Sequence, residues 1–227
     1  MISKRSNEKE LIDLGPDFYT EIEYKHCLEQ LFKINKLIGF FRATVKFLNK
    51  LPSNLTVLDI GCGDGLFILH LNRFFPNMKF QGIDVNPKAI QLAKKNLKKQ
   101  TIKNLNFKLS SQPELILPPN SIDIILSTLV CHHLTDEELI EFLKRSYHSV
   151  RKAVVINDLH RHFFSYFFYK LLSPFFRNRL ITHDGLISIK KGFKRQEWIG
   201  LLNRAGINNY QIQWGFPFRW RVILWKK

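Results

Sequence analysis

The chain has 227 residues, 45% of them hydrophobic and 24% charged, with 11 glycines and 9 prolines. This composition is that of an ordinary globular protein, and it excludes a disordered, collagen-like or disulfide-scaffolded chain. The three cysteines, Cys27, Cys62 and Cys131, form no CxxC pair, and their odd number favours a reducing compartment, so a cytoplasmic location is expected. The first fifteen residues contain no apolar stretch between their charges, which argues against a signal peptide or a membrane span there.

Positive charge is concentrated near the end of the chain. Lysine and arginine outnumber aspartate and glutamate by 35 to 19, a net charge of +16 with an isoelectric point of about 9.9. Residues 159–227 alone hold 13 basic and 2 acidic side chains. Such a region attracts nucleic acid, an anionic membrane or an acidic substrate, or simply forms a solvated surface. Charge alone leaves these alternatives open.

The hydrophobic pattern changes once along the chain. Residues 8–50 carry apolar positions at helical spacing, which predicts an N-terminal helical cap over residues 1–50. After it, short apolar runs alternate with amphipathic segments. Strands are predicted at 55–60, 78–85, 105–109, 122–128 and 152–158, and helices at 66–74, 87–97 and 136–147. Strands that alternate with helices indicate a doubly wound α/β sheet with parallel strands.

The last third of the chain completes this sheet. Residues 159–192 are predicted to form a less regular, aromatic-rich insertion, followed by a helix over 195–206. Strands are predicted at 210–216 and 218–225, and because only Pro217 separates them, they should pair antiparallel. The expected fold is a Rossmann-like seven-stranded sheet, mostly parallel with an antiparallel C-terminal strand. It forms one domain over residues 51–227.

A glycine-rich turn follows the first predicted strand in the segment VLDIGCGDG, residues 57–65. A strand that ends in such a turn and leads into a helix lets a ligand approach the backbone. A dinucleotide fingerprint would need a third glycine where Leu66 stands, and no Walker A motif occurs. The D-x-G-x-G-x-G pattern from Asp59 resembles that of the class I S-adenosylmethionine-dependent methyltransferases. The alternative is a purely structural turn.

This resemblance covers residues 55–158 and implies a site for S-adenosyl-L-methionine. Asp84 lies 23 positions after Gly61, near the spacing at which a carboxylate accepts the ribose hydroxyls, although it could instead cap the next helix, a role that suits Asn86 better. Ser111 stands where the family often has an acid that binds adenine, which is a departure from the pattern. The expected cofactor-binding residues are Asp59, Gly61, Cys62, Gly63, Asp84, Val85, Ser111 and Ser127.

The end of the fourth strand bears on the acceptor. Amine-methylating members of the class usually carry Asn or Asp followed by Pro-Pro-Tyr there, whereas this chain has LSTLVCHHL at 126–134 and so resembles the small-molecule branch. The expected reaction is methyl transfer to an oxygen or carbon of an apolar aromatic, polyketide or quinone-like molecule. Two alternatives stay open: an RNA methyltransferase, which the charge favours and the missing motif opposes, and a non-catalytic cofactor-binding protein at a membrane surface.

Histidine suits proton removal from the acceptor near neutral pH. His132 follows the fourth strand, and strand alternation after the fifth would place Asp158, His160 and His162 on one face. The candidate catalytic residues are His132, His160 and Asp158, with the carboxylate orienting a histidine base. The alternative is that Asp158 and His160 merely satisfy a buried loop. No metal is expected.

Residues 163–176 contain eight aromatic side chains, too few residues to span a bilayer. They are expected to form a substrate lid that faces an anionic membrane together with Arg177 and Arg179, which places the protein at the inner face of the membrane. The alternative is a core helix packed on the sheet. The segments 158–161, 183–185, Ser188 and 192–193 resemble bacterial methyltransferases encoded beside type III polyketide synthases.

Overall fold

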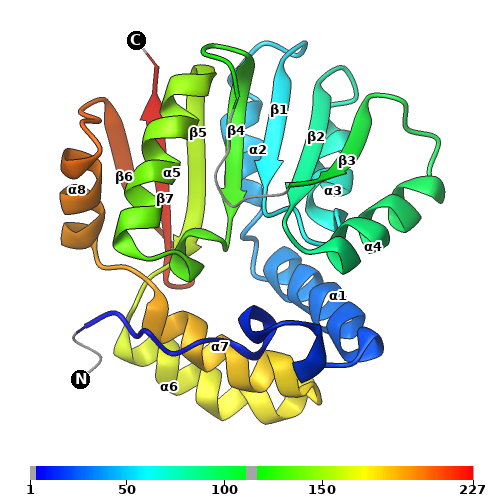
Figure 1. Cartoon of the computed structure of the whole chain (residues 1–227), viewed down its shortest axis with the longest axis vertical. Coiled ribbons are helices and arrows are strands. Elements are labelled where there is room, and N and C mark those ends of the chain that lie inside the picture. Colours follow the sequence, from blue (N-terminus) through cyan, green and yellow to red (C-terminus); the bar gives the residue numbers. More distant parts are fainter. Residues whose placement is uncertain (1–3, 111–116, 227) are drawn as a thin grey trace.

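The computed structural model describes residues 4–110 and 117–226, and a seven-stranded sheet forms its centre (Figure 1). The strand order is β3-β2-β1-β4-β5-β7-β6. Neighbours from β3 to β5 are parallel, and β7 is antiparallel to both β5 and β6. The predicted fold class is therefore confirmed. The strands are β1 (Thr56–Ile60), β2 (Lys79–Asp84), β3 (Leu105–Leu109), β4 (Ile122–Thr128), β5 (Val150–Leu159), β6 (Tyr210–Gly215) and β7 (Arg219–Trp225).

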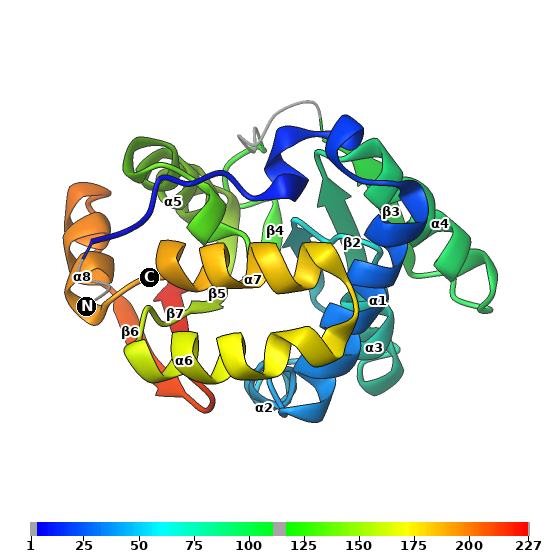
Figure 2. The same ribbon diagram turned by 90° about the horizontal axis from the view of Figure 1, so that it is seen from below.

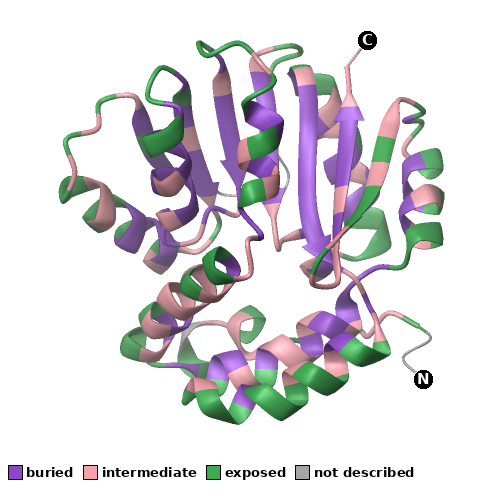
Figure 3. Cartoon of the chain, turned by 180° about the vertical axis from the view of Figure 1, so that it is seen from behind, coloured by how far each residue is buried: buried purple, intermediate pink, exposed green. Residues whose placement is uncertain are grey.

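Helices cover both faces of the sheet, and the central strands are buried between them (Figure 3). Val57 of β1 packs in one apolar cluster with α2 (Arg42–Leu48), α3 (Leu66–Phe74) and α4 (Pro87–Lys98). The next residue, Leu58, points to the opposite face and packs with α5 (Asp136–Ser149) and α8 (Arg195–Arg204). Because successive strand residues face opposite sides, a continuous apolar run marks a strand that is buried on both faces.

The N-terminal region is less helical than its sequence predicts. Residues 4–20, here called the N-terminal strap, contain only two short 3-10 turns, η1 (Leu11–Leu14) and η2 (Pro16–Phe18). Gly15 between these turns has φ +101°, which prevents one continuous helix. The long helix α1 (Glu21–Leu37) begins where Thr20 and Glu23 form a capping box. Helix α2 packs into the apolar core beside the sheet. Only the strap and α1 therefore correspond to the helical cap predicted over residues 1–50.

The aromatic insertion is more regular than expected. It consists of α6 (Phe163–Leu172), the 3-10 turn η4 (Ser173–Phe176) and α7 (Arg179–Lys191), here called the α6–α7 hairpin. His162 caps α6 and Asn178 caps α7, because each side chain accepts a hydrogen bond from the first turn. The two helices lie below the sheet in Figure 1, and Figure 2, seen from below, shows them side by side with the strap running beside α7.

Most rings of α6 do not belong to a core. Phe163, Phe164, Phe167 and Phe168 are each at least 50% exposed. Tyr169, on the inner side, is partly buried, and its hydroxyl donates to the carbonyl oxygen of Ile181 on α7. The helix therefore attaches through one side and leaves an apolar face uncovered. Within the described residues, no helix is both long enough and apolar enough to cross a membrane.

Two glycines have the same φ of +74°, so their substitution separates the free-energy cost of a packing clash from that of backbone strain. A Cβ at Gly65 would lie 2.4 Å from Cζ of Phe107, whereas a Cβ at Gly206 would meet nothing within 4 Å. Gly206→Ala should cost about 1 kcal/mol of unfolding free energy for the left-handed backbone alone. Gly65→Ala should cost a further ~1–3 kcal/mol, because the core has no room for the methyl group. Urea unfolding measures both, and equal losses would contradict the packing.

Candidate functional site

One large cavity lies along the edge of the sheet where the parallel strands end. Its volume is ≈ 1810 Å³, and its wall is formed by the ends of β1, β2 and β4 together with α1, the α6–α7 hairpin and the strap. Pockets for a single small ligand usually measure about 300–1,000 Å³. The cavity is therefore large enough for two ligands side by side.

The glycine turn after β1 forms part of the cavity wall. The backbone N–H groups of Gly61 and Cys62 both donate to the carbonyl oxygen of Ile83, at 2.9 and 3.0 Å, which holds the turn against β2. A Cβ at Gly61 would lie 2.3 Å from Cγ2 of Val130, so this position has no room for a side chain. A Cβ at Gly63 would meet only Leu28, at 3.7 Å. The space in front of Gly63 is thus free for a ligand to touch the backbone.

Asp84 ends β2 and lies beside this turn. Its Oδ2 accepts from the N–H of Gly63 and its Oδ1 from the N–H of Asn86, both at 2.9 Å. Burial raises the pKa of Asp84, and these hydrogen bonds oppose the rise. Asn86 accepts from the N–H of Lys88 and so caps α4, the role that the sequence assigned to it. Asp84 and the neighbouring Val85 both line the cavity and can contact a ligand.

Three other predicted cofactor residues lie behind the cavity wall. Asp59 is 2% exposed, burial raises its pKa, and its Oδ1 has no hydrogen-bond partner among the described residues. Cys62 is buried below the turn, and Ser127 is buried 3.8 Å from the sulfur of Cys131. These three shape the turn and the end of β4 without lining the cavity. Ser111 lies outside the described residues.

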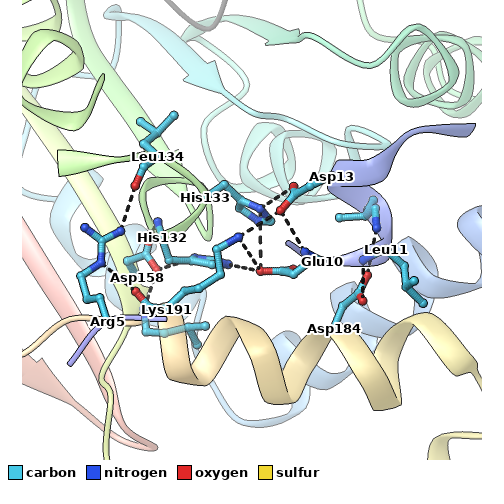
Figure 4. Close-up of polar contacts among 12 residues, drawn as sticks. Arg5, Glu10, Leu11, Asp13, His132, His133, Leu134, Asp158, Asp184 and Lys191 are labelled. Carbon is cyan, nitrogen blue, oxygen red and sulfur yellow. Dashed lines mark hydrogen bonds and ion pairs between the residues drawn. The ribbon is translucent and has the colours of Figure 1, made fainter. Parts of the chain in front are cut away.

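A buried histidine and carboxylate connect the ends of β4 and β5 (Figure 4). The Nδ1–H of His132 donates to Oδ1 of Asp158 at 2.7 Å, and the backbone N–H of His132 donates to Oδ2 at 3.3 Å. Burial alone would raise the pKa of Asp158, but the charge and hydrogen bond of His132 lower it below its ordinary value. His132 lines the cavity, and its Nε2 is the nitrogen left for a ligand.

His160 does not take part in this pair, contrary to the alternation argument. Its Nδ1 accepts from the indole N–H of Trp214 at 3.2 Å, and its ring lies 5.2 Å from that of His162. Burial, together with the nearby His162 and Arg161, lowers the pKa of His160 to about 4. The two histidines do lie together, but Asp158 turns toward the end of β4, where the neighbouring strand brings His132 within reach.

The N-terminal strap brings the carboxylates of Glu10 and Asp13 close to His132 and His133, which the sequence did not indicate. Oδ1 and Oδ2 of Asp184, on α7, accept from the backbone N–H groups of Leu11 and Ile12 at 2.9 and 3.1 Å. These bonds fix the strap so that Glu10, 3% exposed, places its Oε1 3.8 Å from Nε2 of His132. Glu10 forms a local capping box with Asp13, but its partners at the site, His132 and Lys191, are more than a hundred residues away in the chain.

The neighbouring charges form a connected group. Nδ1 of His133 lies 2.8 Å from Oδ1 of Asp13, a contact that raises the pKa of His133 against the effect of burial. The ammonium group of Lys191 lies 3.0 Å from Oδ2 of Asp13 and 3.4 Å from Oε1 of Glu10. We call Glu10, Asp13, His132, His133, Asp158 and Lys191 the buried charge cluster, in which Asp13 and His133 form the partly exposed edge. It joins the strap, α7 and the sheet.

Part of this cluster has the composition of a metal site. Glu10, His132 and His133 offer three possible ligand atoms within 4.8 Å of one another. Lys191 already provides a positive charge to the carboxylate of Glu10, so a metal ion would have to compete with an internal ammonium group. The arrangement is therefore sufficiently explained by its own charges.

Comparison with known proteins identifies the central part of the chain. Residues 51–162 match a family model described as "Methyltransferase domain". The human EEF1A lysine methyltransferase 2 is 40% identical over 76 residues, which are 33% of this chain and 29% of that protein. The chain thus spans about three tenths of the length of the first curated relatives that it matches.

Solved structures share the fold over nearly the whole chain. A methyltransferase from Aquifex aeolicus has a TM-score of 0.61 at 22% identity, covering 85% of this chain and 96% of its own. The plantazolicin methyltransferase BpumL has a TM-score of 0.66 at 18% identity, covering 94% and 92%. The family match thus shows a methyltransferase domain over residues 51–162, and the chain around it has the fold of S-adenosylmethionine-dependent methyltransferases.

Proposed function

We propose that this methyltransferase acts on an oxygen or carbon of an apolar aromatic, polyketide-like or quinone-like small molecule. The observation that carries the proposal is one cavity with two kinds of wall. The glycine turn and Asp84 lie in one part, while His132 and apolar residues of α1 and α6 line another. The human EEF1A lysine methyltransferase 2 aligns with this chain over only 76 residues, so the proposed class of acceptor rests on the cavity.

The first part of the cavity fits the cofactor. Gly63 leaves space for a ligand against the backbone, and the carboxylate of Asp84 keeps lone pairs that can accept from ribose hydroxyls. Bound S-adenosylmethionine supplies a methyl group already activated on a positively charged sulfur. The chain then has to hold the acceptor in line with that methyl group and exclude water.

The buried pair of His132 and Asp158 fits the removal of a proton from the acceptor. Since Nδ1 of His132 donates to Asp158, Nε2 is the nitrogen that can take a proton. Asp158 fixes the orientation of the ring and stabilises a positive charge on it, as Glu10 does from 3.8 Å on the other side. We assign His132 as the base and Asp158 as its positioning residue.

The apolar face of α6 supports a membrane-surface source of the acceptor. Ring contacts run without a break from Trp214 through Phe218, His162, Phe164, Phe163 and Phe167 to Phe168. Phe168 and Leu172 are at least half exposed and also line the cavity, so the uncovered face continues into it. Of the two arginines expected at the membrane, Arg177 is exposed beside Lys170, where both would attract anionic lipid, whereas Arg179 contacts Glu23 and the carbonyl oxygen of Phe18.

Substitutions at the glycine turn and at Asp84 test the cofactor site. Asp84→Ala should weaken binding of S-adenosylhomocysteine by about 1–3 kcal/mol, because hydrogen bonds to a charged acceptor are lost. Gly63→Val should weaken it as well, since a branched side chain would fill the ligand's space. Titration calorimetry measures both, with Glu141→Ala on the outer part of α5 as the control. Wild-type affinity in both variants would contradict the cofactor site.

Substitutions of the histidines test the assignment of the base. His132→Gln and Asp158→Asn should leave the affinity for S-adenosylhomocysteine within about twofold, while methyl transfer falls by roughly 10²–10⁴-fold. The assay follows labelled methyl groups from the cofactor into organic extracts of cell lysate. His160→Gln is the matched control and should retain transfer, because His160 lies outside the cavity wall. An equal loss in His160→Gln would remove the basis for choosing His132.

The α6–α7 hairpin provides a test of the membrane surface. Binding to vesicles should rise with the fraction of phosphatidylglycerol and fall with salt, since exposed cations contribute about 1 kcal/mol each near such a surface. The double substitution Phe167→Ser and Phe168→Ser should abolish vesicle binding and change the melting temperature little, because both rings are 50% exposed. Phe74→Ser, at a ring of similar exposure on α3, is the control. Large losses of melting temperature and cofactor affinity in the double variant would show a core helix.

A further inference from the structure

Arg219 is a positive charge in the cavity wall that makes no ion pair among the described residues, although the more distant carboxylate of Asp158 stabilises its charge. It begins β7 and lines the cavity, with its guanidinium carbon 5.2 Å from the centre of the Phe40 ring. Nη1 donates to the carbonyl oxygen of Phe218 at 3.3 Å, and Nε is buried without a hydrogen-bond partner in the described part of the chain. Burial lowers the pKa of Arg219 to about 10, so it remains charged at neutral pH.

The fully buried Arg161 is paired differently from Arg219, which is only partly buried. Arg161 is 2% exposed, and its guanidinium contacts the carboxylate of Glu197 and the carbonyl oxygen of Gly192. No described carboxylate lies within 4.0 Å of Arg219. A partly buried charge without an ion pair destabilises a fold, so its presence requires an explanation beyond packing.

A second unpaired polar group lies in the same cavity. Asn35 on α1 is 5% exposed and lines the cavity, and its Oδ1 has no hydrogen-bond partner among the described residues. Its backbone carbonyl accepts from the N–H of Phe40 at 2.9 Å, and Phe40 is the ring below Arg219. The surrounding wall is apolar, with Ile38 and Leu172 among its residues. A cation and an amide thus line the cavity beside apolar residues, while the carboxylates of Glu10 and Asp13 in the same cavity already pair with Lys191.

We propose that Arg219 and Asn35 form a subsite for one ionised oxygen acid of the acceptor, such as a carboxylate or an ionised enol, attached to an apolar body. A guanidinium pairs with such an oxygen through short charge-assisted hydrogen bonds, and the Asn35 amide can donate to it as well when a half turn places Nδ2 where Oδ1 lies. A neutral acceptor would leave Arg219 without an ion pair throughout the reaction. This inference rests on the proposed function and narrows its acceptor to apolar anions.

Calorimetry with three probes tests the subsite in protein saturated with S-adenosylhomocysteine. The probes are para-octylbenzoate, its neutral analogue para-octylbenzamide, and octanoyl-cyclohexanedione, an acidic enol. The benzoate, the enol or both should bind roughly 10- to 100-fold more tightly than the benzamide, the range expected for hydrogen bonds to a charged group. The stronger of the two anions identifies which oxygen acid the subsite prefers.

Two variants locate that preference. Arg219→Met should bring anion and amide to equal affinity while leaving the cofactor affinity unchanged. Arg221→Met is the matched control, because Arg221 also has a buried Nε without a hydrogen bond in the described residues but does not line the cavity. It should keep the preference for anions. An anion preference that survives in Arg219→Met, or that disappears in Arg221→Met, would overturn the assignment.

Stability gives an independent readout. If Arg219 is unpaired in the free protein, Arg219→Met should raise the melting temperature without ligand by about 2–4 °C. A large decrease would show that Arg219 stabilises the fold and would overturn the subsite. Equal affinity of the wild-type protein for all probes, or no binding of any, would also overturn it if S-adenosylhomocysteine still binds. Failure of the wild type to bind S-adenosylhomocysteine would instead contradict the proposed function.

Discussion

The hydrogen bonds of Asp158 are the constraint on which the site depends. A fully buried carboxylate is costly unless its oxygens are hydrogen-bonded, and here the imidazole of His132 and two backbone N–H groups supply the donors. This fixes the loop after β4 against the end of β5. His133 is held in the same loop, and it in turn contacts Asp13 of the strap. The floor of the cavity and the strap that covers it are therefore stabilised by one set of charges.

The sheet could be predicted from sequence because its signals are local. Each central strand is buried on both faces and flanked by amphipathic helices, so the apolar runs give strand positions within about two residues of the observed ones. The glycine turn could be predicted as well, because a position without room for a Cβ requires glycine, and Gly61 beside Val130 is such a position. The same locality explains why Asn86 was recognised as a cap, which left Asp84 free for another role.

The contacts that complete the site could not be predicted, because they join distant parts of the chain. Asp158 was expected near His160, but its partner comes from the neighbouring strand, 26 residues earlier. Glu10 reaches its position only because Asp184 binds the strap 173 residues away. Arg219 belongs to a basic region that composition describes as a solvated surface or a binding face. Composition counts charges, and only the position of Arg219 over the Phe40 ring shows that this charge lies in the cavity wall.

The arrangement of polar and apolar walls bears on how an acceptor reaches the cavity. The strap side is closed by the buried charge cluster, and an apolar molecule entering there would have to separate Lys191 from Glu10 and Asp13. On the α6 side, Phe168 and Leu172 are half exposed and also line the cavity, so an apolar molecule can pass them without displacing an ion pair. Arg219 lies on the wall beyond. In the proposed function, an amphipathic anion would leave a membrane surface along α6 past the exposed Lys170 and Arg177, and its charge would reach Arg219 only inside the cavity.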